Sequence, residues 1–385
     1  MRRKVCVVVT ARPSYSRIKT ALAAIAKHPE LELQLVVGAS ALLDRYGTAI
    51  RYIEEDGFEV RARVYMVLEG ENIAAMAKTT GLGLLELATV FDNLKPDVVV
   101  TIADRYETLA TAVAAAYMNI PLAHVQGGEI TGSIDEKVRH AVTKLSNLHF
   151  AASHPAAERL LRLGEDPETV FVTGCPSIDL AAEVASRPQP DFDPLGKYGG
   201  VGAALDLSGG YIVVLQHPVT TEYAEARRHV QETLEAVEEV GLPALWFWPN
   251  VDAGSDGTSN AIRHFREVAH PRHIHFFKNM APTDFLRVVL KSRCLVGNSS
   301  VGIRECSYLG VPAVNIGTRQ AGRDRGGNVR DTGYNRKEIT AAIRAHLGNG
   351  RFPADRLYGD GAAGERIAAL LAERPLLVEK RLAYA

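Results

Sequence analysis

Short apolar runs that alternate with helical patterns constrain the fold of this chain more strongly than any other feature. Between these runs, apolar side chains recur at helical spacing. A continuous apolar run is typical of a strand that is buried on both faces, as in a parallel sheet covered by helices. The alternation therefore predicts an α/β fold built from parallel strand–helix units. In the first half the runs lie at residues 4–9, 31–37, 60–64, 98–102, 120–125, 149–152 and 170–173.

The chain divides into two parts of similar design. At 385 residues it is long for a single core and suits two domains. A stretch rich in Pro and Gly separates two sets of apolar runs, as expected for a linker. We therefore predict an N-terminal domain at residues 1–185, a linker at 186–208, a second domain at 209–362 and a C-terminal helix within 363–385.

The charge and composition of the chain indicate which kinds of molecule it is suited to bind. A formal net charge of −1 and a pI near 6.9 argue against binding to nucleic acid or to a membrane surface. No run approaches the roughly 18 apolar residues of a transmembrane helix, so we expect no membrane span. Four cysteines without metal or redox spacing favour a reducing, cytoplasmic setting. An anionic ligand must therefore be bound by local arginines.

The segment at residues 125–150 gathers acidic side chains where a strand gives way to a helix. Gly127 and Gly128 follow the strand and can take positive φ close to a ligand. The helix start has the Ser-x-x-Glu form of a capping box. Glu129 and Asp135 therefore lie at a strand end, where parallel sheets bind ligands. The alternative is a capped helix whose acids only complement the helix dipole, each worth less than about 1 kcal/mol.

Two consecutive serines, Ser299 and Ser300, follow a strand and open a helix in the second half. Their hydroxyls and the free N–H groups of a helix start form a candidate anion site, although a plain serine cap is the alternative. Glu305 lies on the same helix, and His217 and Asn250 each follow a strand end. Taken singly, these three are equally compatible with a surface acid, a strand-end histidine before proline and a polar turn.

Further candidates lie in a basic loop and at two strand ends of the first half. Arg319 and Arg323 occupy a glycine-containing loop and could meet a phosphate, although either could be a solvated charge. Arg12 and Ser16 follow the first strand. Asp104 follows a buried strand, where it could also serve as a helix N-cap.

The segment from Gly127 to Lys144 closely resembles the Gly-Gly-Glu…Ile-Asp-(Asp/Glu)…Arg-His…Thr-Lys segment of the hydrolysing UDP-N-acetylglucosamine 2-epimerases, which open sialic and nonulosonic acid pathways. Other segments match the same family in order, so the resemblance spans nearly the whole chain. They lie at residues 12–16, 103–105, 216–221, 250–255, 297–305, 317–329 and 358–361.

This resemblance implies two Rossmann-like domains that face a cleft, the GT-B type of arrangement. It implies a nucleotide-sugar substrate with UDP on the second domain, no metal ion and no nicotinamide cofactor. It also implies that the C-terminal helix packs back on the first domain, and we expect a homo-oligomer, a dimer or a tetramer. The residues expected at the substrate are Arg12, Ser16, Arg105, Gln126, Asn250, Ser299, Ser300, Glu305, Arg319 and Arg323.

The implied reaction inverts C2 of an N-acetylhexosamine. Loss of UDP with the C2 proton gives a 2-acetamidoglycal, and water then adds at C1 while C2 is reprotonated. Each positioned acid or base contributes about 10²–10⁴-fold to such a reaction. We expect the catalytic residues to be Asp104, Glu129, Asp135 and His217.

Two positions depart from the family pattern. Ala103 stands where the family has Gly before the Asp-Arg pair. Gln126 stands where several members have Glu, and an amide cannot accept a proton in catalysis. We expect Gln126 to point into the sugar pocket, with Glu129 taking over the proton transfer or with a substrate that differs from UDP-N-acetylglucosamine.

Three other functions remain compatible with the sequence. A non-hydrolysing epimerase would keep the nucleotide on the sugar, a GT-B glycosyltransferase would need an acceptor, and a catalytically silent sensor would bind UDP without turnover. The Gly-Gly-Glu segment and Ala39-Ser40-Ala41, where non-hydrolysing enzymes have Gly-Gln-His, favour the hydrolysing epimerase.

Overall fold

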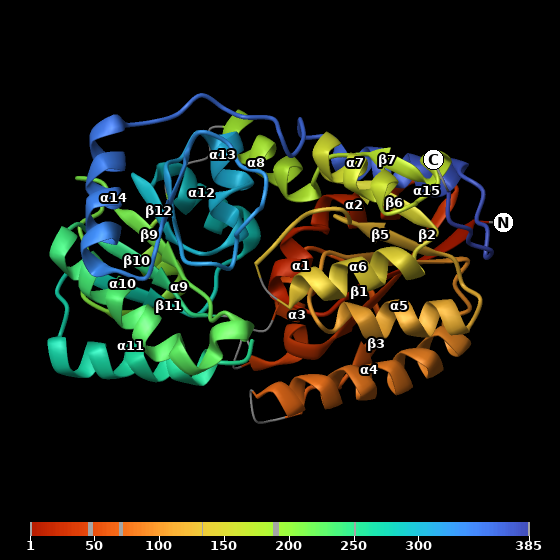
Figure 1. Ribbon diagram of the computed structural model, residues 1–385, viewed down its shortest axis with the longest axis horizontal. Coiled ribbons are helices and arrows are strands. Elements are labelled where there is room, and N and C mark those ends of the chain that lie inside the picture. Colours follow the sequence, from red (N-terminus) through yellow and green to blue (C-terminus); the bar gives the residue numbers. More distant parts are fainter. Residues whose placement is uncertain are drawn as a thin grey trace. The chain divides into compact units, whose positions relative to one another are not determined.

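The computed structural model describes residues 2–44, 49–68, 72–132, 134–187, 192–249 and 252–383. The chain forms two compact units (Figure 1). Unit 1 comprises Met1–Glu129, Ile134–Leu180 and Tyr358–Ala385, and unit 2 comprises Ile130–Ser133 and Ala181–Leu357. The C-terminal residues thus belong with the first half of the chain.

Unit 1 is built on a seven-stranded sheet of the order β3-β2-β1-β4-β5-β6-β7. Every pairing between its described strands is parallel. Its strands are β1 Arg3–Val9, β2 Leu31–Gly38, β3 Val60–Val64, β4 Val98–Ile102, β5 Leu122–Val125, β6 Leu148–Ala151 and β7 Val170–Val172.

Helices cover both faces of this sheet (Figure 1). They are α1 Arg12–Ser16, α2 Lys19–Lys27, α3 Ala49–Glu55, α4 Ile73–Leu94, α5 Thr108–Tyr117, α6 Asp135–Leu145, α7 His154–Arg162 and α15 Ala363–Glu373, with short 3₁₀ helices η1 Ala39–Leu42 and η3 Pro167–Thr169. Helix α8, Pro176–Ser186, runs from unit 1 into unit 2.

Unit 2 repeats this design with the order β14-β13-β12-β9-β10-β11-β8. Only the short edge strand β8 is antiparallel among its described strands. The strands are β8 Val201–Gly202, β9 Ile212–Leu215, β10 Ala244–Phe247, β11 Ile274–Phe277, β12 Cys294–Gly297, β13 Ala313–Ile316 and β14 Val329–Thr332. The helices are α9 Pro194–Tyr198, α10 Ala226–Val240, α11 Ser255–Ala269, α12 Pro282–Lys291, α13 Glu305–Leu309 and α14 Arg336–Asn349, with η4 Thr220–Glu225 and η5 Ser300–Gly302.

The predicted α/β class with two Rossmann-like sheets is confirmed. One local prediction differs from the structure. The stretch 186–208, expected to be a linker, carries α9 and β8, and β8 pairs with β11.

Each sheet has one point at which the strand order reverses. In unit 1 it lies between β1 and β4, and in unit 2 between β9 and β12. Connections leave in opposite directions at such a switch point, so a crevice opens at the carboxyl ends of the two strands. The fold therefore marks the residues after β1, β4, β9 and β12 as the place for ligands.

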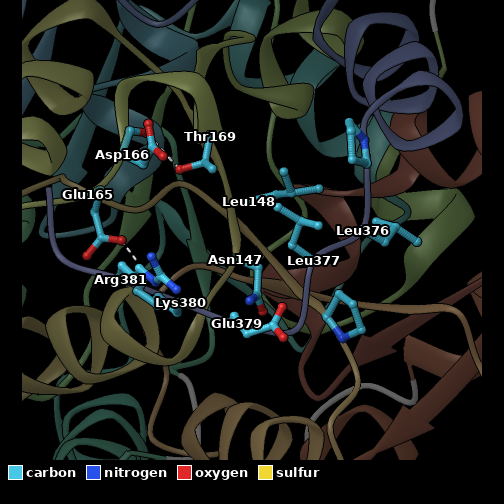
Figure 2. Close-up of a pocket in the computed structure, with 12 residues that line it drawn as sticks. Asn147, Leu148, Glu165, Asp166, Thr169, Leu376, Leu377, Glu379, Lys380 and Arg381 are labelled. Atoms are coloured by element: carbon cyan, nitrogen blue, oxygen red, sulfur yellow. Dashed lines mark hydrogen bonds and ion pairs between the residues drawn. The ribbon is translucent and has the colours of Figure 1, made fainter.

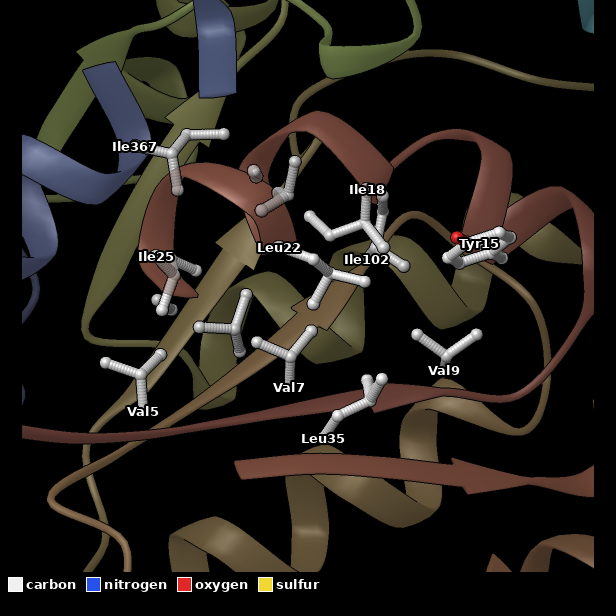
Figure 3. Close-up of a cluster of buried hydrophobic side chains, with 14 of the residues drawn as sticks. Val5, Val7, Val9, Tyr15, Ile18, Leu22, Ile25, Leu35, Ile102 and Ile367 are labelled. Carbon is white, nitrogen blue, oxygen red and sulfur yellow. The ribbon is translucent and has the colours of Figure 1, made fainter. Parts of the chain in front are cut away.

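The core of unit 1 follows from the alternation of side chains along β1. Val5, Val7 and Val9 pack against Ile18 and the inner face of α2 (Figure 3). Cys6 and Val8 point to the other face of the sheet and pack against α4 and α5. Burying one such aliphatic side chain stabilises the fold by about 1.5–3 kcal/mol. Both faces of the strand must therefore be apolar, which is why the sequence shows a continuous run.

Helix α15 packs against α2 in unit 1. Asp179 caps its start and accepts hydrogen bonds from the N–H groups of Ala363 at 2.8 Å and Gly364 at 2.7 Å. A side chain at Gly364 would lie 2.7 Å from the Thr20 backbone, so only glycine allows the two helices to approach this closely. The segment after α15 continues along the same unit.

Residues 375–377 and 379–381 line a cavity of about 360 Å³ with residues just before β5 and β7 and at the start of β6 (Figure 2). It therefore lies at the amino ends of these strands, the edge opposite the switch point. Lys380, which lines this cavity, donates to the Thr143 carbonyl oxygen at 3.1 Å and also to the Ser146 carbonyl oxygen and Glu165. Lys380 thus holds the C-terminal end of α6.

Glu165 is buried and accepts hydrogen bonds from three bases. Its Oε1 lies 2.8 Å from Lys144, and its Oε2 lies 2.8 Å from His149 and also contacts Lys380. Burial alone would raise the pKa of Glu165, but the hydrogen bonds from these bases outweigh it and lower that pKa to about 2. The carboxylate therefore stabilises the fold above its ordinary pKa, and this contribution is lost as the pH falls toward 2.

We predict that Glu165→Gln lowers the free energy of unfolding by about 2 kcal/mol at pH 7, because the partly exposed Lys144 and Lys380 lose the charge of their buried partner. The difference from the wild type should shrink between about pH 4.5 and 2, as Glu165 becomes protonated in the wild type. Urea titrations across this pH range measure it, with the exposed Glu168→Gln as control. A difference that is as large at pH 3 as at pH 6 would contradict the prediction.

Candidate functional site

The switch point of unit 1 collects the residues predicted from the first half. Arg12 and Ser16 lie on α1, which directly follows β1, and Pro13 helps to start this short helix. Asp104 and Arg105 follow β4, the neighbouring strand. Because parallel neighbours end at the same edge, these four residues share one end of the sheet.

The turn that carries Asp104 has a left-handed backbone. Ala103 has φ 62°, a conformation that glycine adopts more easily, and its N–H donates to the Val125 carbonyl oxygen at 2.9 Å. On the other side, His124 Nε2 lies 2.8 Å from the Ala103 carbonyl oxygen. Burial lowers the pKa of His124 to about 3, so the ring is neutral and donates from Nε2. His124 therefore holds the backbone turn at Ala103 in place through this hydrogen bond.

Arg139 of α6 connects the separate parts of this edge. Its guanidinium is fully buried and forms an ion pair with Asp104. It also donates to the Glu129 carbonyl oxygen at 2.8 Å and to Glu136 Oε2 at 2.8 Å. One side chain thus holds the end of β4, the loop after β5 and the first turn of α6 together.

The charges around Arg139 balance its burial. Burial would lower its pKa, but the carboxylates of Asp104, Glu129 and Glu136 outweigh this and raise the pKa of Arg139. The guanidinium is therefore a permanent cation. A second arginine, Arg17, approaches the other Asp104 oxygen at 3.9 Å.

The predicted capping box at the start of α6 rests on Ser133, which lies outside the described residues. The helix begins at Asp135 with Ile134 as its N-cap, which makes no side-chain cap. Glu136 binds Arg139 and, at 3.0 Å, His140. Asp135 thereby occupies the positive end of the helix.

The loop after β5 has one left-handed residue where it was predicted, at Gly128, and one where it was not, at Gln126. Gln126 has φ 69° and Gly128 has φ 74°, whereas Gly127 has no positive φ. A side chain at Gly128 would lie 2.1 Å from the Ala156 carbonyl oxygen, so this position requires glycine. The bend at Gln126 directs the chain toward Glu129, which is buried.

Gln126, which we expect to point into the sugar pocket, also makes a contact inside the protein. Its side chain is buried, and its Nε2 donates to Cys175 Sγ at 2.8 Å. Its Oε1 has no hydrogen-bond partner within the described part of the protein. The amide nitrogen is therefore used inside the protein, and the oxygen is left as an acceptor.

Two arginines at this edge differ in their surroundings. Arg105 forms a two-point ion pair with the buried Glu107, at 3.0 and 3.2 Å. Burial and, to a lesser degree, the charge of Arg105 lower the pKa of Arg12 to about 10. Both still carry a positive charge at neutral pH, so the edge can attract an anion.

The switch point of unit 2 is organised by Asn298, which follows β12. Its side chain accepts from the His217 N–H at 2.7 Å and donates to the His217 carbonyl oxygen at 2.8 Å. His217 follows β9, so Asn298 ties the two strand ends together. Gly297 allows this approach, since a side chain there would lie 2.2 Å from the Leu215 carbonyl oxygen.

The two serines stand directly after Asn298. Ser299 is the N-cap of η5 and accepts from the Val301 N–H at 3.4 Å, and Ser300 is buried beside it. Glu305 begins α13 and is also buried. Its Oε2 has no hydrogen-bond partner among the residues that the structure describes. A buried carboxylate oxygen without a hydrogen-bond partner is destabilising, so this oxygen suits a ligand that donates a hydrogen bond, such as a hydroxyl.

The basic loop of unit 2 closes on the same strand end. Arg319 donates to the Asn298 carbonyl oxygen at 3.3 Å, and Gln320 does so at 2.9 Å. Arg323 is buried and donates to the Ile130 carbonyl oxygen at 3.2 Å, within the short 130–133 segment of unit 2. Arg319 is therefore the loop arginine that shares the site of the two serines.

Two predicted features need separate mention. Asn250 lies outside the described residues, so its predicted role has no structural counterpart here. Among the residues that are described, no group of three His, Cys, Asp or Glu side chains is arranged to hold a metal ion.

A sequence profile of the UDP-N-acetylglucosamine 2-epimerases matches residues 23–372. The chain belongs to this family. One relative, the UDP-N,N'-diacetylbacillosamine 2-epimerase (hydrolyzing) of Legionella pneumophila, is 31% identical over 98% of this chain and 97% of its own. The UDP-N-acetylglucosamine 2-epimerase of Neisseria meningitidis serogroup B is 30% identical over 96% of this chain and 95% of its own.

Solved structures of the family share the fold. The Neisseria meningitidis UDP-GlcNAc 2-epimerase bound to UDP-GlcNAc superposes with a TM-score of 0.78 at 16% identity, over 96% of this chain and 100% of that chain. The Methanocaldococcus jannaschii UDP-GlcNAc 2-epimerase in complex with UDP-GlcNAc and UDP gives a TM-score of 0.75 at 19% identity, over 96% of this chain and 99% of that chain.

Three residues of the candidate site, Arg139, His124 and Asn298, were not among the predicted site residues. Arg139 and Asn298 lie in segments that match the family, but all three bind mainly other protein groups, so the sequence assigned them no role toward a ligand. A signal existed for the first two, since a charged or polar residue at a position that should be buried needs a partner.

Proposed function

We propose that this protein is a hydrolysing nucleotide-sugar 2-epimerase. It converts UDP-N-acetylglucosamine, or a related UDP- or GDP-N-acetylhexosamine, and water into a free N-acetylmannosamine-type sugar and the nucleoside diphosphate. The observation that carries the proposal is the 31% identity along 98% of the chain to an epimerase named as hydrolysing. The two switch points supply groups suited to the two halves of such a substrate.

We assign the nucleotide to unit 2. The hydroxyls of Ser299 and Ser300 and the N–H groups at the start of η5 suit a diphosphate, and Arg319 adds a positive charge at the same strand end. The unpartnered Oε2 of Glu305 suits a ribose hydroxyl. In this assignment Arg323 supports the loop through Ile130. Asn250 remains a proposed contact on sequence grounds alone.

We assign the sugar to the carboxyl edge of the unit 1 sheet. Arg139 fixes the Asp104 carboxylate and the loop of Glu129, while Asp135 starts α6 at the same edge. Arg12, Ser16 and Arg105 provide polar groups beside them. The free acceptor of Gln126 suits the N–H of an acetamido group.

The reaction then needs a base, an acid and a stabilised leaving group. A base removes the C2 proton, the C1–O bond breaks, and its electron pair leaves with the β-phosphate of UDP. Water adds at C1 of the resulting 2-acetamidoglycal, and an acid returns a proton to the other face of C2. We assign this acid–base work to Asp104, Glu129, Asp135 and His217, and the stabilisation of the leaving diphosphate to the arginine and serine groups.

The sugar itself is the open part of the proposal. Relatives at 31% and 27% identity are named for a diacetylbacillosamine substrate, and one at 30% for UDP-N-acetylglucosamine. Gln126 is a candidate for this choice, because its amide oxygen can accept from one acetamido group or another. We further propose that the enzyme acts in the cytoplasm as a homo-oligomer.

Isotope labelling tests the reaction directly. With UDP-N-acetylglucosamine in heavy water, we predict a free sugar that carries deuterium at C2, because the proton is removed and returned from solvent. In ¹⁸O-labelled water the label should enter C1, since the C1–O bond breaks before hydration. NMR and mass spectrometry measure both.

Other outcomes separate the alternatives. A product that keeps the nucleotide identifies a non-hydrolysing epimerase, and UDP release only in the presence of an acceptor identifies a glycosyltransferase. Label found only in the phosphate would exclude the proposed mechanism.

Substitutions should separate the two halves of the site. We predict that Asp104→Asn lowers turnover at least 100-fold with UDP affinity nearly unchanged, because its carboxylate lies on the sugar side. The double variant Ser299→Ala/Ser300→Ala should weaken UDP binding about 10-fold or more, since it removes two hydroxyl contacts. Calorimetry with UDP and steady-state kinetics measure both. Equal UDP affinity in the serine variant and the wild type would refute the assignment to unit 2.

A further inference from the structure

The thiol of Cys175 lies in polar surroundings that the proposed reaction does not use. Cys175 directly precedes α8 in unit 1, and its side chain is fully buried. Its Sγ accepts a hydrogen bond from Nε2 of Gln126 at 2.8 Å and lies 3.0 Å from the hydroxyl oxygen of Ser177. The other cysteine of unit 1, Cys6, is equally buried but lies in an apolar cluster. Packing alone therefore does not account for the cysteine at position 175.

The backbone fixes the place of this thiol. The N–H of Cys175 donates to the Tyr358 carbonyl oxygen at 2.8 Å, and its carbonyl oxygen accepts from the Ile178 N–H at 2.9 Å. Gly174, just before it, has φ 86°, and a side chain there would lie 3.2 Å from the Cα of Gly359. Two segments that are distant in the sequence, the start of α8 and the stretch before α15, therefore hold the thiol in place.

The thiol in turn sets the orientation of the Gln126 amide. Gln126 directly follows β5, and its side chain has a donor end and an acceptor end. Ser177 can accept the thiol proton, which leaves the sulfur to accept from the donor end of the amide. The acceptor end, Oε1, is then turned away from Cys175, and it is buried without a hydrogen-bond partner in the part of the chain that the structure describes. A buried acceptor in this state suits a ligand that donates an N–H.

We propose that Cys175 is a positioning residue for the sugar: its thiol holds the Gln126 amide so that Oε1 faces the N–H of the acetamido group. This inference rests on the proposed function, which assigns Gln126 to the sugar. Without the sulfur acceptor the amide can turn by half a rotation, and its donor end then meets the acetamido N–H. Two donors repel each other, so the sugar binds less tightly. Cys175 thus acts on sugar binding through Gln126 and takes no part in the proton transfers.

Two substitutions of Cys175 separate its hydrogen bond from its packing. Cys175→Ala removes the acceptor, and we expect it to raise KM for UDP-N-acetylglucosamine about 10-fold with kcat little changed. Cys175→Ser keeps an acceptor and should restore KM to within about 3-fold of the wild type. Affinity for UDP alone should be the same in all three proteins, because the nucleotide is assigned to unit 2. Cys6→Ala, which removes the same atom from an apolar cluster, is the matched control, and circular dichroism checks that each variant is folded.

A double-mutant cycle with Gln126→Ala gives the decisive result. Cys175→Ala should lower kcat/KM about 10-fold in the wild-type background but less than about 2-fold in the Gln126→Ala background, because a residue that acts through Gln126 then has nothing to position. Equal losses in both backgrounds, no rescue by Cys175→Ser, weaker UDP binding in Cys175→Ala, or an unchanged KM would each overturn the proposal.

Failure of the proposed function would be seen separately. If the wild type turns over no UDP-N-acetylhexosamine, that function is refuted, and the same cycle is read by calorimetry with UDP-N-acetylglucosamine and with UDP. The affinity for the nucleotide sugar relative to UDP should then fall in Cys175→Ala, and it should stay constant when Cys175→Ala is added to Gln126→Ala. A relative affinity that is indifferent to Cys175→Ala would overturn the positioning role as well.

Discussion

The ion pair between Arg139 and Asp104 is the interaction on which the unit 1 site depends. A buried guanidinium is strongly destabilising unless its charge and donors are matched. The chain matches them with Asp104 from the end of β4, the Glu129 carbonyl from the loop after β5, and Glu136 from α6 itself. Because all three must be in place together, the end of one strand, the next loop and the start of the helix adopt a single arrangement.

In unit 2 a neutral side chain, that of Asn298, holds the ends of two neighbouring strands together. The amide of Asn298 pairs with both backbone groups of His217, and the carbonyl of Asn298 receives Arg319 and Gln320. The Arg139–Asp104 ion pair and the Asn298 side chain each lie where the strand order of their sheet reverses. The proposed division of labour, with acids at one switch point and anion-binding groups at the other, therefore follows from where the two sheets open.

The sequence predicted what periodicity and local chemistry determine. The apolar run at 98–102 matches β4 at both ends, because a strand buried on both faces has no polar residue to obscure it. The predicted capping box rests on Ser133, which lies outside the described residues, whereas the contact of Glu136 with Arg139 depends on tertiary structure that local sequence does not reveal. Likewise Gln126 takes a positive φ that local preference assigns to glycine. The sequence did not predict strand β8 within residues 186–208, because a two-residue strand has no pattern of its own and forms only by pairing with β11.

The measurement that tests the central claim most directly is amide hydrogen exchange with UDP alone, read by mass spectrometry. If the nucleotide binds unit 2, exchange should slow in peptides that cover residues 216–221, 297–305 and 317–323. Peptides at 103–107 and 126–129 should slow only when Asp135→Asn, which should bind substrate without turning it over, is given UDP-N-acetylglucosamine. Protection of 103–107 and 126–129 by UDP alone, with 297–305 unchanged, would contradict the division between the two units.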